Sequence, residues 1–475
     1  MSTLEELRAK LESANQYHVL DHWDTLSDEE HARLATQIES IDFDLMDQLI
    51  DAWILSSSSG QQFQEIAPAS VQPPTTVPRE GLDGARIAGE QALRDGRVGL
   101  VLVAGGQGTR LGYPGPKGAF PIGPVSGRSL FAFHAEKIHG IQRRYGCVLP
   151  WYIMVGETNE VATKDFFAEN KFFGLDESNV TFFKQRMMPC VDEAGNFILS
   201  ETGLLAMNPN GHGGCIPALV ENGILDDARA RGIDTFSYFQ VDNWATRLAD
   251  PHFIGYHLLN DGEISSKAHR KQEVREAAGV FCRCDGKLRV IEYTEYDIYP
   301  QLLDLDNDGN IIHFASNAAI HVLSVEFIQR VYDRYSEFPW HCSHKKIPYV
   351  DELGTLVEPS SPNGYKFETF IFDSLQYAER DNVVLEIAKA GETTPTKQMT
   401  GSGSVEESRN AMSKYWGAWV TAAGCTRDLS GVTVEISPQF ALDQDEFVER
   451  ASDFEWPAEG PIAMGPEGAF IPTAD

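Results

Sequence analysis

Short continuous apolar runs alternate along the chain with segments whose apolar residues recur at helical spacing. Four runs have the length of buried strands: residues 98–104, 151–155, 180–183 and 235–241. Between these runs, the apolar residues of segments 129–145 and 161–173 recur at helical spacing. In residues 279–294 and 311–323 apolar and polar positions alternate, which predicts hairpins. The pattern predicts an α/β fold with a mostly parallel, mixed sheet flanked by helices, of the Rossmann-like kind.

The first 55 residues predict helices. Thr3-x-x-Glu6 and Ser27-x-x-Glu30 are capping-box patterns, and leucines and isoleucines follow each of them at helical spacing. The stretch 56–80 is rich in serine and proline and predicts an extended connection without helix or sheet hydrogen bonds.

Beyond Gly424 the chain is acidic and contains several glycines and prolines, which predicts a small, loosely folded lobe. We therefore expect three parts: an N-terminal helical region and linker over residues 1–80, a central catalytic domain over 81–424, and an acidic C-terminal lobe over 425–475.

The charge balance narrows the classes of function. Thirty-nine basic residues against 70 acidic ones give a net charge of −31, which argues against binding to nucleic acid or to a membrane surface. No apolar run approaches the ~20 residues of a membrane span. The chain starts without a signal-peptide pattern, and its seven cysteines form no CxxC pair, so we expect a cytoplasmic protein with reduced thiols.

A glycine-rich stretch follows the first apolar run: Leu-Val-Ala-Gly-Gly-Gln-Gly-Thr-Arg-Leu-Gly-Tyr-Pro-Gly-Pro-Lys-Gly, residues 102–118. Glycines after a strand can present backbone N–H groups to phosphates, and Arg110 and Lys117 add cations. The dinucleotide fingerprint fails because Leu111 replaces its third glycine. The P-loop pattern fails because Lys117 stands between Pro116 and Gly118.

This L-x-A-G-G-x-G-T-R-L-G…P-K signature resembles that of the nucleotidyltransferases that make sugar nucleotides. Further matching segments cover nearly the whole chain: 151–154, 182–189, 240–243, 279–283, 291–295, 345–351, 362–368, 370–373 and 435–438. The chain resembles the eukaryotic-type UDP-sugar pyrophosphorylases (UDPGP type 1), and most of all those that act on N-acetylglucosamine. The resemblance implies that a sugar 1-phosphate attacks the α-phosphorus of UTP, giving a UDP-sugar and pyrophosphate.

The resemblance also implies roles for individual residues. Arg110, Lys117 and Lys366 would bind phosphates and stabilise the developing charge as catalytic residues. The other nucleotide contacts implied are backbone or side-chain contacts from Ala104, Gly105, Gly106, Gln185, Gly213 and Lys397, with Gln185 and Gly213 at uracil.

Asp242 follows the strand run 235–241, and a carboxylate at a strand end beside phosphates suits Mg²⁺, for which Mn²⁺ can substitute. The resemblance makes it both a metal ligand and a substrate contact; the alternative is a helix N-cap. By the same resemblance the sugar contacts are Gly279, Glu292, Tyr293 and Asn317.

His212 departs from the pattern. The N-acetylglucosamine enzymes carry Asn at this position, whereas glucose-type relatives carry His, so glucose or galactose 1-phosphate is the alternative substrate. A non-catalytic sensor of UDP-sugars is an alternative of another class. For assembly we expect a monomer or a weak homo-oligomer.

Overall fold

The computed structural model describes residues 3–56, 63–78, 80–201, 203–351, 354–380 and 382–471. It contains two compact units, each assembled from three segments. The smaller unit comprises Met1–Phe63, Gln185–Cys215 and Ser336–Asp373, and the larger unit comprises Gln64–Lys184, Ile216–Tyr335 and Ser374–Asp475. The domain limits expected at residues 80 and 424 would instead divide the chain into three consecutive parts, and they stay a prediction.

The smaller unit begins with three helices, α1 (Leu4–Ser13), α2 (Asp28–Ser40) and α3 (Phe43–Ile50). Both predicted capping boxes are confirmed: the Thr3 and Ser27 hydroxyls accept hydrogen bonds from the N–H groups of Glu6 and Glu30. The strands of this unit pair in small antiparallel groups: β15 (His341–Lys345), β18 (Gly364–Glu368) and β6 (Val191–Asp192); β5 (Met187–Pro189) and β9 (Met207–Pro209); β7 (Leu199–Glu201) and β8 (Leu204–Leu205); β16 (Tyr349–Val350) and β17 (Leu356–Val357).

An apolar core joins the helices of this unit to its strands. Leu7, Leu34 and Ile38 of the helices are at most 1% exposed and pack in one cluster with Val191 and Phe367 of the strands. The helical spacing seen in the sequence therefore reflects packing against strands that lie far away along the chain.

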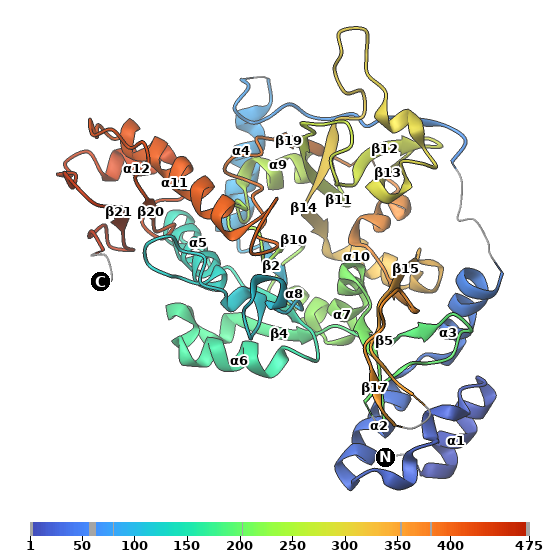
Figure 1. The fold of residues 1–475 in the computed structure, drawn as a ribbon. Coiled ribbons are helices and arrows are strands. Elements are labelled where there is room, and N and C mark those ends of the chain that lie inside the picture. Colours follow the sequence, from blue (N-terminus) through green and yellow to red (C-terminus); the bar gives the residue numbers. More distant parts are fainter. Residues whose placement is uncertain are drawn as a thin grey trace. The chain divides into compact units, whose positions relative to one another are not determined.

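The larger unit is built on a ten-stranded mixed sheet (Figure 1). Its parallel part has the order β4 (Val180–Lys184), β3 (Trp151–Val155), β2 (Val98–Val103) and β10 (Thr235–Gln240). Its other part contains β14 (Ala315–Ser324), β11 (Ile264–Arg270), β19 (Val384–Ile387), β12 (Val280–Cys284), β13 (Lys287–Ile291) and β1 (Ile66–Pro68). The predicted α/β class and the four apolar-run strands are confirmed.

Two sequence-based expectations about strands were wrong. Residues 311–323 form no hairpin, because residues 315–324 are one long strand, β14, that pairs with β10, β11 and β12. The connection 56–80 does contribute to the sheet, since Ile66–Pro68 pairs antiparallel with β12. Proline at the end of an edge strand is compatible with this pairing. Residues 57–62 and 79 of that connection lie outside the described residues.

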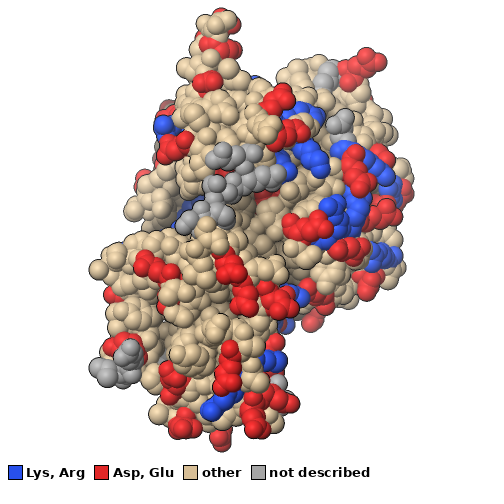
Figure 2. Space-filling model, turned by 90° about the vertical axis from the view of Figure 1, so that its right-hand side faces the viewer, with Lys and Arg blue, Asp and Glu red and all other residues tan. Residues whose placement is uncertain are grey.

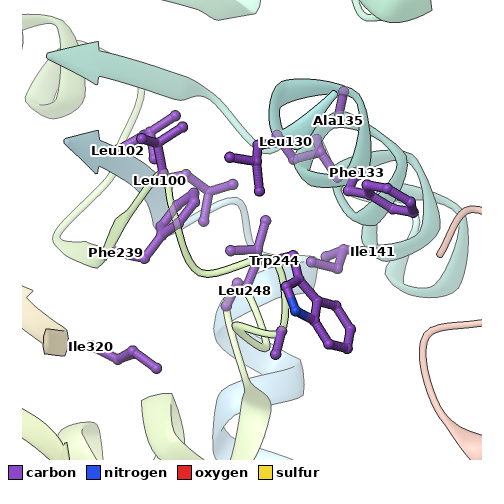
Figure 3. Close-up of a cluster of buried hydrophobic side chains, with 14 of the residues drawn as sticks. Leu100, Leu102, Leu130, Phe133, Ala135, Ile141, Phe239, Trp244, Leu248 and Ile320 are labelled. Carbon is purple, nitrogen blue, oxygen red and sulfur yellow. The ribbon is translucent and has the colours of Figure 1, made fainter. Parts of the chain in front are cut away.

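Helix α5 (Leu130–Tyr145) covers the parallel strands through a dense apolar core (Figure 3). Leu100 and Leu102 of β2 and Leu130 of α5 are fully buried in it. Helices α4 (Leu82–Arg94) and α9 (Pro251–Leu259) approach unusually closely beside it. A Cβ atom on Gly255 would lie 1.6 Å from the Ala85 carbonyl oxygen, so only glycine permits this approach.

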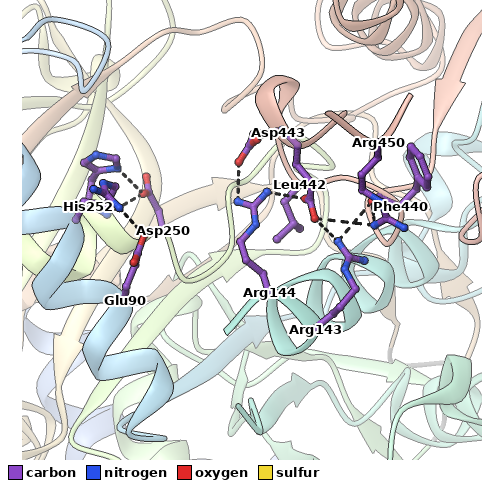
Figure 4. A network of polar contacts seen from close by, with 11 residues as sticks. Glu90, Arg143, Arg144, Asp250, His252, Phe440, Leu442, Asp443 and Arg450 are labelled. Carbon is purple, nitrogen blue, oxygen red and sulfur yellow. Dashed lines mark hydrogen bonds and ion pairs between the residues drawn. The ribbon is translucent and has the colours of Figure 1, made fainter. Parts of the chain in front are cut away.

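The acidic C-terminal segment is well packed, which corrects the expectation of a loose lobe. It contains β20 (Val434–Ile436), paired in parallel with β21 (Ile462–Met464), and α12 (Gln444–Arg450), beside α11 (Val405–Ala422). Its acidic residues neutralise arginines at the end of α5: Arg144 pairs with Asp443 at 2.6 Å and with Glu446 at 2.5 Å (Figure 4). Composition alone did not reveal these partners, which lie almost 300 residues away.

No helix among the described residues is long and apolar enough to cross a membrane. On the face drawn in Figure 2, acidic side chains are scattered widely and basic side chains mostly lie beside them.

Burial makes the stability of the larger unit dependent on pH. It lowers the pKa of His257 in α9 to about 4, whereas the unfolded side chain has a pKa near 6.5. Between these values the unfolded chain binds more protons, so the free energy of unfolding falls as the pH is lowered. We expect His257 to account for a loss of about 2 kcal/mol between pH 7 and pH 5.

Urea unfolding at both pH values checks this expectation. His257→Gln, which keeps a hydrogen-bonding group near the Ser265 hydroxyl that lies 2.9 Å from His257 Nδ1, should lose correspondingly less stability on acidification than the parent protein. An identical pH dependence of the two proteins would contradict the assignment.

Candidate active site

The glycine-rich loop leaves the carboxyl end of β2 in the middle of the parallel strands. It folds back on itself, because Gly108 N–H donates to Gly115 O at 2.8 Å and Lys117 N–H donates to Gly106 O at 3.1 Å. Gly106 is exposed, and nothing lies within 4 Å of a Cβ atom added to it. Backbone N–H groups of the loop can therefore meet a phosphate without steric obstruction.

Asn159 hydrogen-bonds through its side chain to the backbone of this loop, a role that the sequence analysis did not predict. Its side chain is 1% exposed and donates to Ala104 O at 2.8 Å and to Gly106 O at 3.2 Å, while accepting from Gly156 N–H at 2.9 Å. Asn159 follows β3, the strand next to β2. Its position after an apolar strand run was the available signal, because adjacent parallel strands end at the same edge.

Lys117 and Asp242 form the charged centre of the site. Lys117 Nζ lies 2.8 Å from Asp242 Oδ2, and the two side chains are 18% and 11% exposed. Asp242 follows β10, and the register of β10 with β2 pairs Gln240 with Val103. Two loops from neighbouring strands thus bring together a cation and a carboxylate that are 125 residues apart in sequence.

Helix α5 holds the loop that carries Asp242. His134 hydrogen-bonds through Nε2 to Val241 O at 3.2 Å, and Lys137 donates to Thr246 O at 2.8 Å and to Trp244 O. Burial lowers the pKa of His134 to about 3, so its ring is neutral and donates the proton at Nε2. These buried donors fix the backbone on both sides of Asp242.

A third segment, residues 392–399, is hydrogen-bonded to the same two loops. Thr396 N–H donates to Asp242 O at 2.9 Å, Thr394 N–H donates to Asn243 Oδ1 at 2.9 Å, and Met399 N–H donates to Arg110 O at 3.2 Å. The side chains of Arg110 and Lys397 are exposed. Neither side chain has an ion-pair partner within the described part of the chain, so both cations remain available to an anionic ligand.

The carboxylate of Asp242 suits a Mg²⁺ ion that binds together with the nucleotide. The described residues contain no cluster of three or more His, Cys, Asp or Glu side chains that could cage a metal. Mg²⁺ with a nucleotide is commonly held by one or two carboxylates, substrate phosphates and water. One largely buried carboxylate beside a phosphate-type loop meets that requirement.

The predicted sugar contacts form a separate group in the same unit. Gly279 O accepts a hydrogen bond from Asn317 N–H at 2.8 Å, and a Cβ atom on Gly279 would lie 2.5 Å from Glu292 Oε1. Gly279, Glu292 and Asn317 are thus neighbours across β12, β13 and β14. Tyr293, which starts the next 3₁₀ turn, is 45% exposed.

In the smaller unit, Gln185 is bound to the second glycine loop. Its side chain is 5% exposed, and its Nε2 donates to Asn210 Oδ1 at 3.1 Å and to Gly211 O at 2.5 Å. Gly211 has a φ of +82°, and a Cβ atom there would lie 2.3 Å from Thr369 O. Glycine is therefore required where this loop approaches Thr369.

Gly213 and His212 pack against the segment after β18. Gly213 N–H donates to Thr369 O at 2.8 Å. His212 Nδ1 accepts from Ile371 N–H at 3.1 Å, and its ring stacks on Phe370 with a centroid distance of 5.2 Å. Phe370 and Ile371 thus set the orientation of the His212 ring, which the sequence alone did not indicate.

Lys366 lies in β18, opposite Ser343 of β15. Its side chain is half-buried and has no ion-pair partner among the residues that the structure describes.

The predicted site residues are divided between the two units. The larger unit contains Ala104, Gly105, Gly106, Arg110, Lys117, Asp242, Gly279, Glu292, Tyr293, Asn317 and Lys397, and the smaller unit contains Gln185, His212, Gly213 and Lys366.

Comparison with known proteins identifies the family. The sequence profile of the family described as UTP–glucose-1-phosphate uridylyltransferase (UDPGP) matches residues 44–397, which is more than half of the chain. The chain belongs to this family. The profile match includes every residue predicted for the site.

Individual UDPGP relatives extend the match beyond the profile. UDP-N-acetylhexosamine pyrophosphorylase-like protein 1 of Xenopus tropicalis is 36% identical over 83% of this chain and 80% of its own length. UDP-N-acetylglucosamine diphosphorylase 2 of Arabidopsis thaliana is 33% identical over 95% of this chain and 92% of its own. The uridine diphosphate N-acetylglucosamine pyrophosphorylase from Trypanosoma brucei, crystallised with an inhibitor, is structurally similar with a TM-score of 0.81 at 25% identity, covering 95% and 97%.

The hydrogen bonds by which Lys137 holds the backbone after Asp242 can be tested without substrates. Lys137→Met removes two hydrogen bonds from a buried cation to backbone carbonyls, which should loosen residues 244–248 and accelerate their amide hydrogen exchange about tenfold. Lys164→Met, on the exposed face of α6 (Glu160–Glu169), is the matched control and should leave this exchange unchanged. Equal exchange in both variants would show that Lys137 does not hold the loop.

Proposed function

We propose that this UDPGP-family chain is a UTP:sugar-1-phosphate uridylyltransferase, a nucleotidyltransferase that forms a UDP-sugar and pyrophosphate. The observation that carries the proposal is the Lys117–Asp242 pair at 2.8 Å beneath an open glycine loop at the ends of β2 and β10. The names of the relatives, which are pyrophosphorylases and diphosphorylases of UDP-N-acetylglucosamine, support the same reaction.

Uridylyl transfer asks the protein mainly for alignment and neutralisation of charge. A phosphate oxygen of the sugar 1-phosphate attacks the α-phosphorus of UTP, and the bond to the β-phosphate oxygen breaks as pyrophosphate leaves. The glycine loop binds the UTP phosphates through N–H groups of Gly105 and Gly106, whereas the Ala104 N–H donates to Met154 O at 2.9 Å and holds the start of the loop on the sheet. Arg110 and Lys117 stabilise the negative charge that grows on the leaving pyrophosphate.

Asp242 would hold Mg²⁺, which when bound neutralises phosphate charge and orients the phosphates. Lys117 pairs with the Asp242 carboxylate and is 18% exposed. The pair holds the Lys117 ammonium group beside the glycine loop, where we propose that the phosphates bind. Lys366 and Lys397, both without an ion-pair partner in the described parts of the chain, supply further positive charge for the substrate phosphates.

Base and sugar recognition fall to the two other groups. Gln185 offers its side-chain oxygen to uracil, because its Nε2 group already donates to Asn210 Oδ1 and Gly211 O, and these contacts fix the amide orientation. Gly213 leaves space for the base because it carries no side chain. Glu292 and Asn317 offer hydrogen-bonding groups suited to sugar hydroxyls. The sugar proposed first is N-acetylglucosamine 1-phosphate, and the odd, unpaired pattern of cysteines supports a cytoplasmic location.

His212 favours a second candidate sugar within the same reaction. Its ring is oriented by Phe370 and Ile371 rather than disordered at the surface, so it can contact a sugar and discriminate. Glucose or galactose 1-phosphate is therefore the second candidate.

A substrate panel tests the proposed reaction. Pyrophosphate release is measured with UTP, Mg²⁺ and the 1-phosphates of N-acetylglucosamine, N-acetylgalactosamine, glucose and galactose. We expect the highest kcat/KM with N-acetylglucosamine 1-phosphate. Preference for glucose or galactose would assign discrimination to His212, and no release with any sugar, from folded protein, would reject the enzyme in favour of a UDP-sugar sensor.

Charge variants separate the roles of Lys117 and Asp242. Lys117→Met should lower kcat about 100- to 1,000-fold even at saturating Mg²⁺, because it removes a cation from the developing charge. Asp242→Asn should in addition raise the Mg²⁺ concentration needed for half-maximal turnover. Lys164→Met, on exposed α6, controls for loss of positive charge and should change neither value.

Gly106→Ala distinguishes a ligand contact from a folding role. Because nothing lies within 4 Å of the added Cβ atom, the melting temperature should stay unchanged. Turnover should nevertheless fall at least tenfold, since the methyl group would occupy space that the nucleotide needs. Full activity of Gly106→Ala would place the nucleotide away from this loop.

A further inference from the structure

A cavity of about 530 Å³ lies in the larger unit, on the α5 side of the sheet. Its walls come from α4, α5, the segment 244–252, α11 and the segment 438–449. None of the residues predicted for the active site lines it. Its volume is within the range that takes a small organic ligand.

Most carboxylates around this cavity are neutralised by basic partners in its walls or directly behind them. Glu90 pairs with Arg86 at 2.9 Å and with Arg94 at 3.0 Å. Asp250 pairs with the fully buried Lys267 at 2.7 Å.

The remaining acidic residues belong to the C-terminal segment. Asp443 and Glu446 are held by Arg144, and Figure 4 shows Arg144 beside Asp443. Asp445 and Glu449 of α12 are exposed to solvent, which screens their charge. The acidic groups of the lining are thus paired or solvated.

One cation of the lining, Lys137, lacks this compensation, and a second, Arg247, has only a long ion pair. Lys137 contacts the carbonyl groups of Trp244 and Thr246, and within the described chain no carboxylate lies at ion-pair distance from it. Burial lowers the pKa of Lys137 to about 7, as expected for an ammonium group without an acidic partner. Arg247 pairs with Glu392 at 3.9 Å, and its side chain is 39% exposed. Burial lowers the pKa of Arg247, but Asp250 and Glu392 outweigh this effect and raise it.

Two buried donors in the same wall also lack acceptors. Among the described residues the Trp244 indole N–H and the Thr246 hydroxyl have no hydrogen-bond partner, although the residues are only 2% and 1% exposed. A buried donor without an acceptor is energetically costly, so these groups would gain from an acceptor if the wall rearranged around a ligand. The observation that favours an anion is Lys137, together with the exposed part of Arg247.

Aromatic rings supply the rest of the wall. Trp244 lies 5.4 Å from Trp416, and Tyr415 lies 5.0 Å from Trp419, measured between ring centroids. Figure 3 shows Trp244 beside Ile141 and Leu248, which also line the cavity. Such a wall suits a planar ring in contact with apolar and aromatic surface.

We propose that this cavity is a binding site for a small ligand that combines a planar aromatic ring with an anionic group. Lys137 and Arg247 meet the anion, and Tyr415 with the neighbouring tryptophans meets the ring. This site does not depend on the proposed uridylyl transfer, and binding to it is measured with no substrate present.

Naphthalene-2-carboxylate is the probe, and neutral naphthalene-2-carboxamide of the same shape is its control. Ligand-observed NMR titration of the full chain should give a dissociation constant of about 1 mM or tighter for the carboxylate. The amide should bind at least fivefold more weakly. Equal binding of the two probes, or no binding of the carboxylate, would overturn the proposal.

Variants locate the probe. Arg247→Met should weaken carboxylate binding at least fivefold, and Arg247→Lys, which keeps the charge, should retain most of it. Arg229→Met, an exposed arginine paired only with neighbours on α8 (Ile224–Ala230) and α10 (Val325–Tyr332), is the matched control and should bind normally. Unchanged binding in Arg247→Met would place the probe elsewhere and reject this cavity.

A ligand in the cavity would touch the groups that hold the Asp242 loop, since Lys137 and residues 244–248 are part of its wall. If uridylyl transfer is confirmed, saturating naphthalene-2-carboxylate should shift the Mg²⁺ concentration for half-maximal turnover at least twofold. No shift at saturation would reject coupling to Asp242 and leave the binding site to be judged by the titrations alone.

Discussion

The parallel pairing of β2 with β10 is the constraint on which the candidate active site depends. Because Val103 and Gln240 are partners in this ladder, the glycine loop and the Asp242 loop must leave the sheet at the same edge. The 2.8 Å contact between Lys117 and Asp242 follows from that register. A shift of one residue would turn the apolar side chains of β10 to the opposite face and separate the pair.

Loops without ladder hydrogen bonds need other partners, and buried polar side chains provide them. Asn159 satisfies carbonyls of the glycine loop, while His134 and Lys137 satisfy carbonyls on either side of Asp242. A buried amide or ammonium is costly unless it is hydrogen-bonded, so each of these residues stabilises one loop arrangement over alternatives. Preorganised donors of this kind are what transfer of a charged phosphoryl group requires.

An acidic chain reaches a phosphate-binding arrangement by local distribution of its cations. Many basic side chains are paired with acidic neighbours, as at Arg144 with Asp443 and Glu446. Arg110, Lys397 and Lys366 lack such partners in the described chain. Net charge therefore argues against nucleic acid as a partner but does not describe the local positive charge around individual side chains such as these.

The sequence by itself determined the α/β class, the four parallel strands, the capped N-terminal helices and the glycine loop with its cations, because each depends on local pattern and chemistry. It also indicated the family, which the profile match confirmed. It did not reveal that residues 66–68 join the sheet, that residues 315–324 are one strand, or that the acidic tail packs on α5, because those outcomes depend on partners distant in the chain. Asn159, Lys137 and Phe370 were missed for the same reason: their contacts exist only after strands and helices far apart in sequence have paired. Tertiary structure alone decided which polar groups became buried together, since burial and hydrogen bonding are properties of the packed chain and not of any local segment.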